Sequence, residues 1–403
     1  MTSPPRRSRP VAMIVHSYYE EDPRVRREAE ALVARGREVD VFALRQPGLP
    51  RSEVIEGVHL TRLDVRRQQG AGLRVYLAEY LWFFVRSGWA LTATHRRRRY
   101  GIVQVHSLPD FLVFATLPLR LVGVPVILDL HEAMPEFFRT RFPGADNRLT
   151  HWALLLQERL AIAYASKALS VNELMADRLL SLGIPAAKVA IVPNSPNLAL
   201  FDPTVRPRRG FREDGSLRIV YTGALTPTYE LDVSLDAVAR LAGLRPDIDV
   251  RLELYGRGDS EEMLRQRAVR LGIADRVTFH GRIPIEDVPS AVARADIGIA
   301  PTRLDDFTRV SLSTKVFEYG AMGKPVVASR LPLVERTFPE GTVAAYEPGV
   351  PAAMVAAILG FVDDPVVREA AVARTTAVIQ DHAWEREADR YAALVASLER
   401  VAR

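Results

Sequence analysis

The segment SLSTKVFEYGAMGKPVVAS, residues 311–329, is the part of the sequence from which the fold is most readily predicted. Its final run, PVVAS, is short and apolar like a buried strand, and so is the run ADIGIAPT at 295–302. Residues 315–322 lie between these two runs and are expected to form a helix. A strand, a helix and a second strand in this order are typical of a parallel α/β sheet.

Short apolar runs alternate with helical stretches along the rest of the chain, and most runs are apolar at both odd and even positions. Such strands are expected in a parallel sheet whose two faces are both covered by helices. The strands expected in the first half are 11–17, 38–44, 58–64, 102–107, 125–131, 167–172 and 189–194. Those expected in the second half are 217–225, 249–256, 276–283, 295–302, 325–329 and 342–348.

Residues 194–216 separate the two series of strands. This stretch is rich in Pro, Arg and Gly and has no hydrophobic period, so we interpret it as a linker. We predict an α/β fold of two facing, Rossmann-like, doubly wound domains at 1–200 and 201–380, with a final helix at 381–403 that packs back on the first domain. Because such sheets bind ligands at the carboxyl ends of their strands, the active site is predicted in the cleft between the domains.

The composition of the 403 residues excludes several classes of protein. Without cysteine, the chain has no disulfide framework, no catalytic thiolate and no thiolate metal ligands. A net charge of +5 is small for this length, and we expect no nucleic acid partner. The sequence has neither a signal-peptide pattern nor a run of about 20 uncharged apolar residues, so we expect a cytoplasmic protein.

Lysine is rare in this chain, and its positions are informative. Of the 54 basic residues 50 are arginine, and lysine occurs only at Lys167, Lys188, Lys315 and Lys324. An ammonium is compact and strongly hydrated, and it does not replace a guanidinium at a tight site. Lys315 falls at the start of the expected 315–322 helix, where free backbone N–H groups attract anions such as phosphate.

Glu318 follows Lys315 by three residues and lies on nearly the same face of the expected helix. Its carboxylate can accept two hydrogen bonds from a diol such as a ribose. One helix start would then offer both a phosphate site and a ribose acceptor. The alternative is that the two residues form an ordinary ion pair on the helix.

The run TKVFEYGAMGKPVVAS resembles the donor-site signature of family-4 retaining glycosyltransferases, whose fold, GT-B, consists of two facing Rossmann-like domains. The resemblance covers nearly the whole chain and is strongest to the branch that builds bacterial capsular polysaccharides and exopolysaccharides. It also includes, in order, the runs YYEEDPRVRREAEALVARGREVDV, VQVHSLPDFL, VILDLHEAMPEFF, VAIVPNSPN, LELYGRGD, VTFHGRIP and ADIGIAPT.

The resemblance implies roles for individual residues. Glu318 matches the glutamate that holds the donor ribose, and His131 matches the histidine beside the anomeric centre of the transferred sugar. The implied donor-binding residues are Gly223, Gly256, Gly258, Arg282, Ile283, Ser313, Thr314, Lys315 and Glu318. The implied catalytic residues are His131 and Lys315, and His106 and Tyr18 are implied near the acceptor. The alternative for each histidine is a structural role.

Two departures from the family pattern concern charge. The first glutamate of the usual signature is Val310 here, and the Arg and Lys that many relatives place in the second domain are replaced at or near Ala224 and Glu230. Because a leaving diphosphate needs neutralisation, Lys315 is expected to be its main cation. The retaining branch generally works without metal, and no D-x-D motif stands in a suitable place, so we expect no metal and no other cofactor.

Residues 74–100 form an unusually aromatic helical stretch. The stripe expected in the core consists of Leu73, Leu77, Tyr80 and Phe84. A second stripe consists of Trp82, Val85 and Trp89, and it is followed by four arginines at 96–99. This second stripe suits an anionic membrane surface. The alternatives are a fully buried helix pair and, for the arginines, a solvated helix end.

These features predict a cytoplasmic retaining glycosyltransferase, peripheral on the inner face of the membrane. It would move a sugar from a nucleoside diphosphate sugar, with UDP or GDP expected, to a glycan, lipid-linked or natural-product acceptor. One alternative is a sugar-nucleotide epimerase of the same fold. Another is a binding partner for nucleotide sugars without catalysis, which the residues Ala224 and Glu230 would suit.

Overall fold

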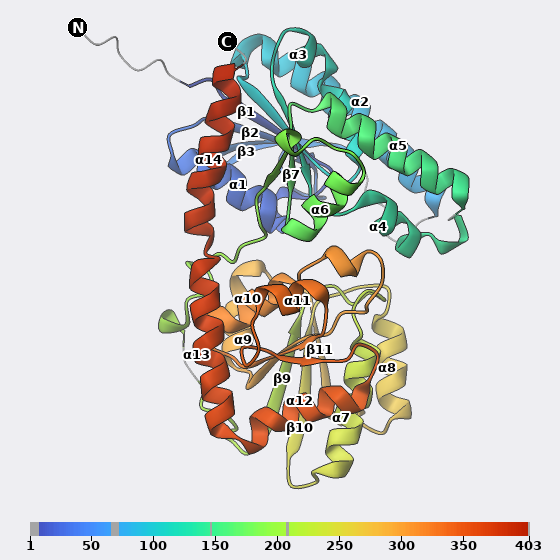
Figure 1. The fold of residues 1–403 in the computed structure, drawn as a ribbon, viewed down its shortest axis with the longest axis vertical. Helices are drawn as coiled ribbons and strands as arrows, with labels where there is room; N and C mark the ends of the chain where they lie inside the picture. Colours follow the sequence, from blue (N-terminus) through green and yellow to red (C-terminus); the bar gives the residue numbers. More distant parts are fainter. Residues whose placement is uncertain (1–7, 66–71, 146, 207–208, 402–403) are drawn as a thin grey trace, which may run out of the picture. The chain divides into compact units, whose positions relative to one another are not determined.

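The computed structural model describes residues 8–65, 72–145, 147–206 and 209–401. The chain forms two compact units, each with its own sheet (Figure 1). Unit 1 consists of Met1–Asn194 together with Glu385–Arg403, and unit 2 consists of Ser195–Trp384. The chain therefore passes from one unit to the other twice.

Unit 1 contains an eight-stranded sheet with the order β3-β4-β2-β1-β5-β6-β7-β8. Neighbouring strands are parallel except for β3 and β4, which are antiparallel. The strands are β1 (Val11–Val15), β2 (Val39–Leu44), β3 (Ser52–Ile55), β4 (Val58–Leu63), β5 (Ile102–His106), β6 (Val126–Leu130), β7 (Lys167–Ser170) and β8 (Val189–Ile191). The seven strands expected in this part of the chain are present.

Strand β3 was not predicted from the sequence. Its residues, SEVI, are mostly exposed, and it lies at the edge of the sheet. A short edge strand of this kind has no buried apolar run, so it gives no periodic signal.

The helices of unit 1 cover both faces of its sheet. They are α1 (Pro23–Ala34), α2 (Leu73–Arg98), α3 (Leu117–Leu121), α4 (Met134–Arg141), α5 (Arg148–Tyr164), α6 (Glu173–Ser181) and α14 (Trp384–Val401), with the 3-10 segments η1 (Tyr19–Glu21) and η2 (Asp110–Thr116). Val103 and Val105 of β5 join the core on the α2 and α5 side. Gln104 points to the opposite face, where α1 and α14 lie (Figure 1).

Unit 2 contains a six-stranded, fully parallel sheet with the order β11-β10-β9-β12-β13-β14. Its strands are β9 (Ser216–Thr222), β10 (Asp249–Tyr255), β11 (Val277–Gly281), β12 (Ile297–Ala300), β13 (Val326–Ser329) and β14 (Ala344–Tyr346). Its helices are α7 (Leu231–Leu244), α8 (Glu261–Arg270), α9 (Val288–Ala293), α10 (Thr314–Ala321), α11 (Pro332–Thr337), α12 (Pro351–Asp363) and α13 (Pro365–Asp381). All six strands expected here are present.

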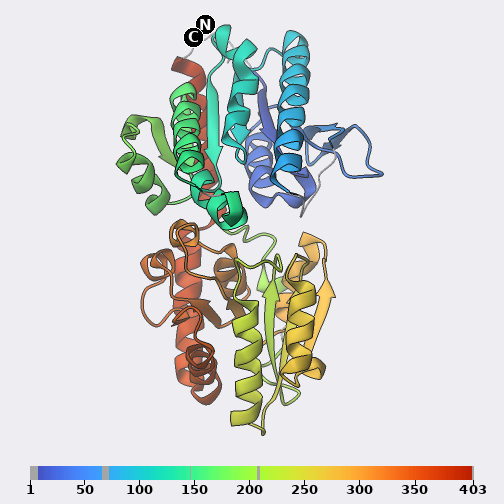
Figure 2. The ribbon, with the colours of Figure 1, turned by 90° about the vertical axis from the view of Figure 1, so that its right-hand side faces the viewer.

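Both faces of the unit 2 sheet are buried, which explains the continuous apolar runs of the sequence. Ile219 and Tyr221 of β9 lie in a core with α7 and α12, whereas Val220 lies in a second core with α9 and α10. Figure 2 shows the two units turned by 90°, so that each sheet can be followed between its helices. Both units are thus doubly wound, as predicted.

The buried face of α2 differs from the predicted one. Its fully buried residues are Glu79, Phe83, Ser87 and Leu91. Leu77, which was expected in the core, is 46% exposed, so the predicted core stripe is wrong at this position, whereas Phe84 of the same stripe packs against the core. Because Glu79 and Ser87 are polar, a search of the sequence for stripes of apolar residues does not find this face. None of the helices that the structure describes has the length and apolar character needed to cross a membrane.

All three residues of the second stripe of α2 are exposed, with Trp82 at 52%, Val85 at 57% and Trp89 at 75%. The arginines that follow it are not equivalent. Arg96, Arg97 and Arg99 are exposed, but Arg98 donates to both carboxylate oxygens of Asp40 at 2.8 and 2.7 Å. Arg98 therefore ties the end of α2 to β2, and the interpretation of 96–99 as a wholly solvated helix end is wrong.

Candidate functional site

The carboxyl edge of the unit 2 sheet contains a point where the order of the strands reverses, between β9 and β12. Ligands of doubly wound sheets bind at such points. Gly223 follows β9 directly and has a φ of 142°, a conformation that side chains other than glycine rarely adopt. The loop after β9 is therefore the natural starting point for a site.

Helix α10 is fixed over the end of β9 by Tyr319. The backbone N–H of Thr222 donates to the Tyr319 hydroxyl at 2.8 Å, and both residues are buried. Gly298 of β12 allows this approach, because a Cβ at that position would lie 2.3 Å from the Tyr319 ring. These contacts hold the first turn of α10 beside Gly223.

Lys315 lies in this first turn with 8% of its surface exposed. Its Nζ is 4.2 Å from the centre of the Tyr229 ring and 5.2 Å from that of Tyr221. It also lies directly over Gly223, where a Cβ would be 2.9 Å from Nζ. No carboxylate in the described parts of the chain forms an ion pair with Lys315. A buried ammonium without an anionic partner is costly, and it suits an anionic ligand.

The other three lysines donate hydrogen bonds to backbone carbonyls. Lys324 Nζ donates to the Ala293 carbonyl, at the end of α9, at 2.8 Å. Lys188 donates to the carbonyls of Ala163 and Ala165 around the end of α5, and Lys167 donates to a third carbonyl in unit 1. An ammonium at a helix C-terminus stabilises the free carbonyls there. Lys315 therefore differs in environment from the other three.

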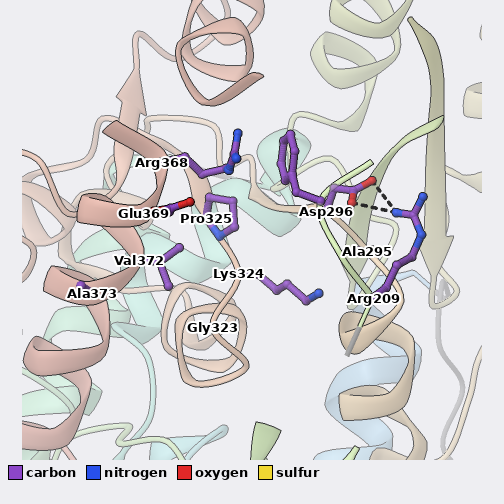
Figure 3. A pocket seen from close by; sticks show the side chains of 11 residues that line it. Arg209, Ala295, Asp296, Gly323, Lys324, Pro325, Arg368, Glu369, Val372 and Ala373 are labelled. Carbon is purple, nitrogen blue, oxygen red and sulfur yellow. Dashed lines mark hydrogen bonds and ion pairs between the residues drawn. The ribbon is translucent and has the colours of Figure 1, made fainter. Parts of the chain in front are cut away.

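Lys324 lines a separate pocket of unit 2, with a volume of about 360 Å³ (Figure 3). This pocket lies beside the residues that precede β12 and β13, at the opposite edge of the sheet from Gly223. Its Asp296 is paired with Arg209 at 2.7 Å. The neighbouring lysines 315 and 324 thus belong to different surroundings.

Ser313, Thr314 and Glu318 surround Lys315 on α10. The Ser313 hydroxyl is buried, and no residue that the structure describes bonds to it. The pKa of the half-buried Glu318 is raised, because the effect of burial outweighs the lowering by Lys315 and by a hydrogen bond from Thr314. Lys315 and Glu318 do not form the ordinary ion pair considered above. Ser313 before α10 and Lys315 and Glu318 within it therefore keep a hydroxyl, an ammonium and a carboxylate available for a ligand.

The glycines of LYGRGD allow two loops to approach each other. A Cβ on Gly256 would lie 1.7 Å from the Gly223 carbonyl oxygen, and one on Gly258 would lie 2.2 Å from that of Leu225. Leu225 in turn donates from its N–H to the Arg257 carbonyl at 3.0 Å. The absence of side chains at these glycines therefore lets the loop after β10 pack directly against the loop after β9.

Arg282 and Ile283 follow β11, at the far end of the same sheet edge. The N–H of Gly256 donates to the carbonyl of Gly281 at 2.8 Å, which connects this turn to the glycine loop. The Arg282 side chain is exposed, and Ile283 packs against the α9 and α10 core. The structure therefore places them one loop away from Gly223.

The residues at or near the positions where many relatives carry Arg and Lys, Ala224 and Glu230, make other contacts in this chain. The Ala224 carbonyl accepts a hydrogen bond from the Tyr221 hydroxyl at 2.7 Å, and buried Glu230 accepts one from the Gly349 N–H at 2.8 Å. Arg303, a cation that sequence reasoning missed, follows β12 and donates from its N–H to the Thr228 carbonyl at 2.9 Å. A positively charged residue after a strand at the reversal point would have been the signal for it.

Unit 1 has its own reversal point, between β1 and β5, and a cluster of polar side chains beside it. His106 ends β5, Asp129 lies in β6 and His131 follows β6. Oδ2 of Asp129 is 2.9 Å from Nδ1 of His106 and 3.0 Å from Nε2 of His131. Burial lowers the pKa of His131, but Asp129 outweighs this effect, so the pKa is raised. His131 is therefore biased toward its charged form.

His106, Asp129 and His131 are also the candidate metal ligands of the described residues. The guanidinium of Arg24 donates to both oxygens of Asp129, at 2.8 and 2.6 Å. Its positive charge would oppose a divalent cation at the same carboxylate. The geometry does not favour a metal at this cluster.

Two further residues lie after β1. Tyr18 is half-buried and packs against the unit 1 core. His16, which sequence reasoning missed, is buried with its Nε2 3.0 Å from Oε1 of Glu79 in α2. A histidine directly after the first strand was the available signal.

Comparison with known proteins follows the division into two units. Residues 22–195 match the family model for a glycosyl transferase 4-like domain, and residues 216–364 match that for glycosyl transferases group 1. The chain is 26% identical over 361 residues to the phosphatidyl-myo-inositol mannosyltransferase of Mycobacterium leprae, covering 88% of this chain and 87% of that protein.

Two solved structures show the same fold. Sucrose-phosphate synthase from Thermosynechococcus elongatus superposes with a TM-score of 0.78 at 20% identity, covering 97% of this chain and 99% of the other. HepE of Anabaena, solved with UDP-glucose, has a TM-score of 0.71 at 15% identity, covering 96% and 99%.

Proposed function

This chain belongs to the family-4-type glycosyltransferases of GT-B fold, and we propose that it is a retaining enzyme that transfers a sugar from a nucleoside diphosphate sugar. The observation that carries the proposal is the buried ammonium of Lys315, without an anionic partner in the described chain and directly over Gly223. A nucleoside diphosphate supplies the missing anion. We propose a glycan, a lipid-linked sugar or a natural product as acceptor.

Each side chain of the α10 turn has a role in this proposal. Lys315 and the Ser313 hydroxyl bind the diphosphate, and their electrostatic stabilisation grows as the leaving group gains charge. Glu318 accepts hydrogen bonds from the ribose hydroxyls. His131, from unit 1, contacts the transferred sugar beside its anomeric carbon, where its raised pKa favours a hydrogen-bond donor.

The test of this function is a screen of nucleotides followed by an assay of turnover. UDP and GDP come first, and UDP-glucose is a suitable first donor because the structurally similar HepE was solved with it. A bound nucleotide should raise the melting temperature by mass action. Release of nucleoside diphosphate from the matching sugar nucleotide then shows catalysis. Binding without release under any acceptor would favour a binding protein instead.

Glu318→Ala is expected to weaken the binding of the preferred nucleoside diphosphate by roughly 1.5–3 kcal/mol for each hydrogen bond lost to its charged carboxylate. Calorimetry measures this change directly. Glu335→Ala, which removes a carboxylate paired with Arg330 on the surface of unit 2, is the matched control and should bind as the wild type does. Equal affinities in all three proteins would remove Glu318 from the ribose site.

We further propose that unit 1 contacts an anionic membrane through α2. The exposed Trp82 and Trp89 supply apolar contact, and the exposed Arg96, Arg97 and Arg99 supply charge. This placement supports a peripheral position on the cytoplasmic face and a lipid-linked acceptor.

Changing Arg96, Arg97 and Arg99 together to Gln should reduce sedimentation with vesicles that contain anionic lipid. Each basic residue near such a surface contributes about 1 kcal/mol before screening by salt. The melting temperature should not change, because Arg98 and its pair with Asp40 are retained. Arg98→Gln is the opposite control, which should lower stability more than vesicle binding. Equal sedimentation of the triple variant and the wild type would contradict the membrane proposal.

A further inference from the structure

Arg24 connects the first helix of unit 1 to the histidine cluster. It lies in α1 with 4% of its surface exposed, and it forms a two-point pair with Asp129. Nε donates to Oδ2 at 2.8 Å, and Nη2 donates to Oδ1 at 2.6 Å. A planar guanidinium fits this geometry and an ammonium does not. Both oxygens of Asp129 are therefore fixed from α1.

The same carboxylate holds His131. Because Oδ2 of Asp129 accepts from Nε2 of His131 at 3.0 Å, Nδ1 is the ring nitrogen left for a ligand. We propose that Arg24 is a positioning residue for His131: it fixes the carboxylate that sets the orientation and tautomer of the imidazole. This inference rests on the proposed role of His131 at the sugar, but its main test does not require turnover.

Arg24 also contacts residues 192–194, where the segment Met1–Asn194 of unit 1 ends. Its Nη1 donates to the Val192 carbonyl at 2.8 Å and to Oδ1 of Asn194 at 3.0 Å. Arg27, one turn along the helix, donates to the same Asn194 oxygen at 2.7 Å. Because Arg24 has these structural contacts as well, loss of stability in a variant would not identify a positioning role.

The charges around His131 make the two roles separable. Besides Asp129 and Arg24, the groups that face the cluster are Glu28 and Arg27 of α1, Asp22 before it, His106 of β5, Glu132 and the Tyr391 hydroxyl of α14. Asp129 raises the pKa of His131, and Arg24 lowers it. Removing Arg24 should therefore raise the titration midpoint of His131, and removing the charge of Asp129 should lower it.

The experiment follows the ring nitrogens of 15N-labelled histidine by NMR, with the His131 signal assigned from its absence in His131→Gln. Arg24→Gln should move the His131 midpoint up, and Asp129→Asn should move it down. Arg26→Gln is the matched control, because Arg26 lies on the same helix in a half-exposed pair with Glu30. Its midpoint should equal that of the wild type.

With the donor found by the nucleotide screen, Arg24→Gln should lower kcat by about 10- to 100-fold, as expected when a catalytic group is misplaced. Affinity for the nucleoside diphosphate should not change, because Lys315 and Glu318 lie in unit 2. Arg24→Lys keeps the charge but loses the fork, so kcat should fall with little change in the midpoint. This variant also serves if Arg24→Gln does not fold.

The proposal is overturned if Arg24→Gln or Asp129→Asn lowers the melting temperature while the His131 midpoint stays at the wild-type value. Wild-type kcat in Arg24→Lys would overturn it as well, because the two-point pair would then be dispensable. If the midpoints move as expected but no donor is turned over, the positioning of His131 stands and the proposed transferase activity fails. The two proposals therefore fail by different results.

Discussion

Lys315→Arg is expected to keep the charge of the wild-type enzyme and to lose most of its activity. The ammonium lies 4.2 Å from the Tyr229 ring centre, and a single Cβ on Gly223 would already be 2.9 Å from it. A planar guanidinium is larger and cannot enter this space without moving the ring or the loop. We expect kcat/KM to fall by roughly 10²–10³-fold, as when one preorganised donor to a developing anion is lost.

Lys315→Ala separates charge from shape. Its affinity for the nucleoside diphosphate should fall by about 1.5–3 kcal/mol, the contribution of a hydrogen bond to a charged group. Affinity for the bare nucleoside should hardly change, because the ribose keeps Glu318. Calorimetry with both ligands measures the difference. Lys324→Ala is the matched control, since Lys324 serves the Ala293 carbonyl and should affect stability alone.

Two results would contradict this account of Lys315. Full activity in Lys315→Arg would show that the choice of lysine at this position is accidental. Full activity in Lys315→Ala would remove Lys315 from the site altogether.

His131→Ala is expected to lower turnover by about 10²–10⁴-fold, the usual range for a positioned proton donor or acceptor, and to leave donor affinity nearly unchanged. The reason is its location: His131 follows β6 in unit 1, whereas the proposed diphosphate and ribose contacts lie in unit 2. Steady-state kinetics with calorimetry of the nucleoside diphosphate gives both quantities.

The control for His131 is His59→Ala, which removes an exposed imidazole from β4 of the same sheet. It should behave as the wild type. If His131→Ala keeps its turnover and only its melting temperature falls, the histidine is structural.

Much of the fold could be predicted because buried parallel strands leave a strong signal. Thirteen apolar runs correspond to strands, and Asp22 caps α1 where the sequence DPR predicts it, accepting from the Val25 N–H at 3.2 Å. Edge strand β3 and the buried face of α2 were missed for the same reason. Both contain polar residues where the prediction relies on apolar ones: β3 has no buried apolar run, and the buried face of α2 includes Glu79 and Ser87.

The sequence indicates which residues form the candidate site, but it does not indicate which side chains surround them. The sequence indicates Lys315 through its rarity, yet the rings of Tyr221 and Tyr229 around it come from other elements. The same holds for Arg24, which meets Asp129 across 105 positions of chain. Such contacts depend on the order of strands in the sheet, and local patterns do not contain that order.

The double passage of the chain between units has a consequence for synthesis on the ribosome. Helix α14 covers one face of the unit 1 sheet, with the Tyr391 hydroxyl 2.7 Å from Oε1 of Gln104, but it is made after all of unit 2. Until then the nascent first unit lacks the cover that α14 gives to this face, and Gln104 keeps its bond to Glu28 of α1 but not the one to Tyr391. Completion of the earliest domain therefore waits for the last helix, and a fragment that stops at residue 194 should be aggregation-prone unless α14 is supplied as a separate peptide.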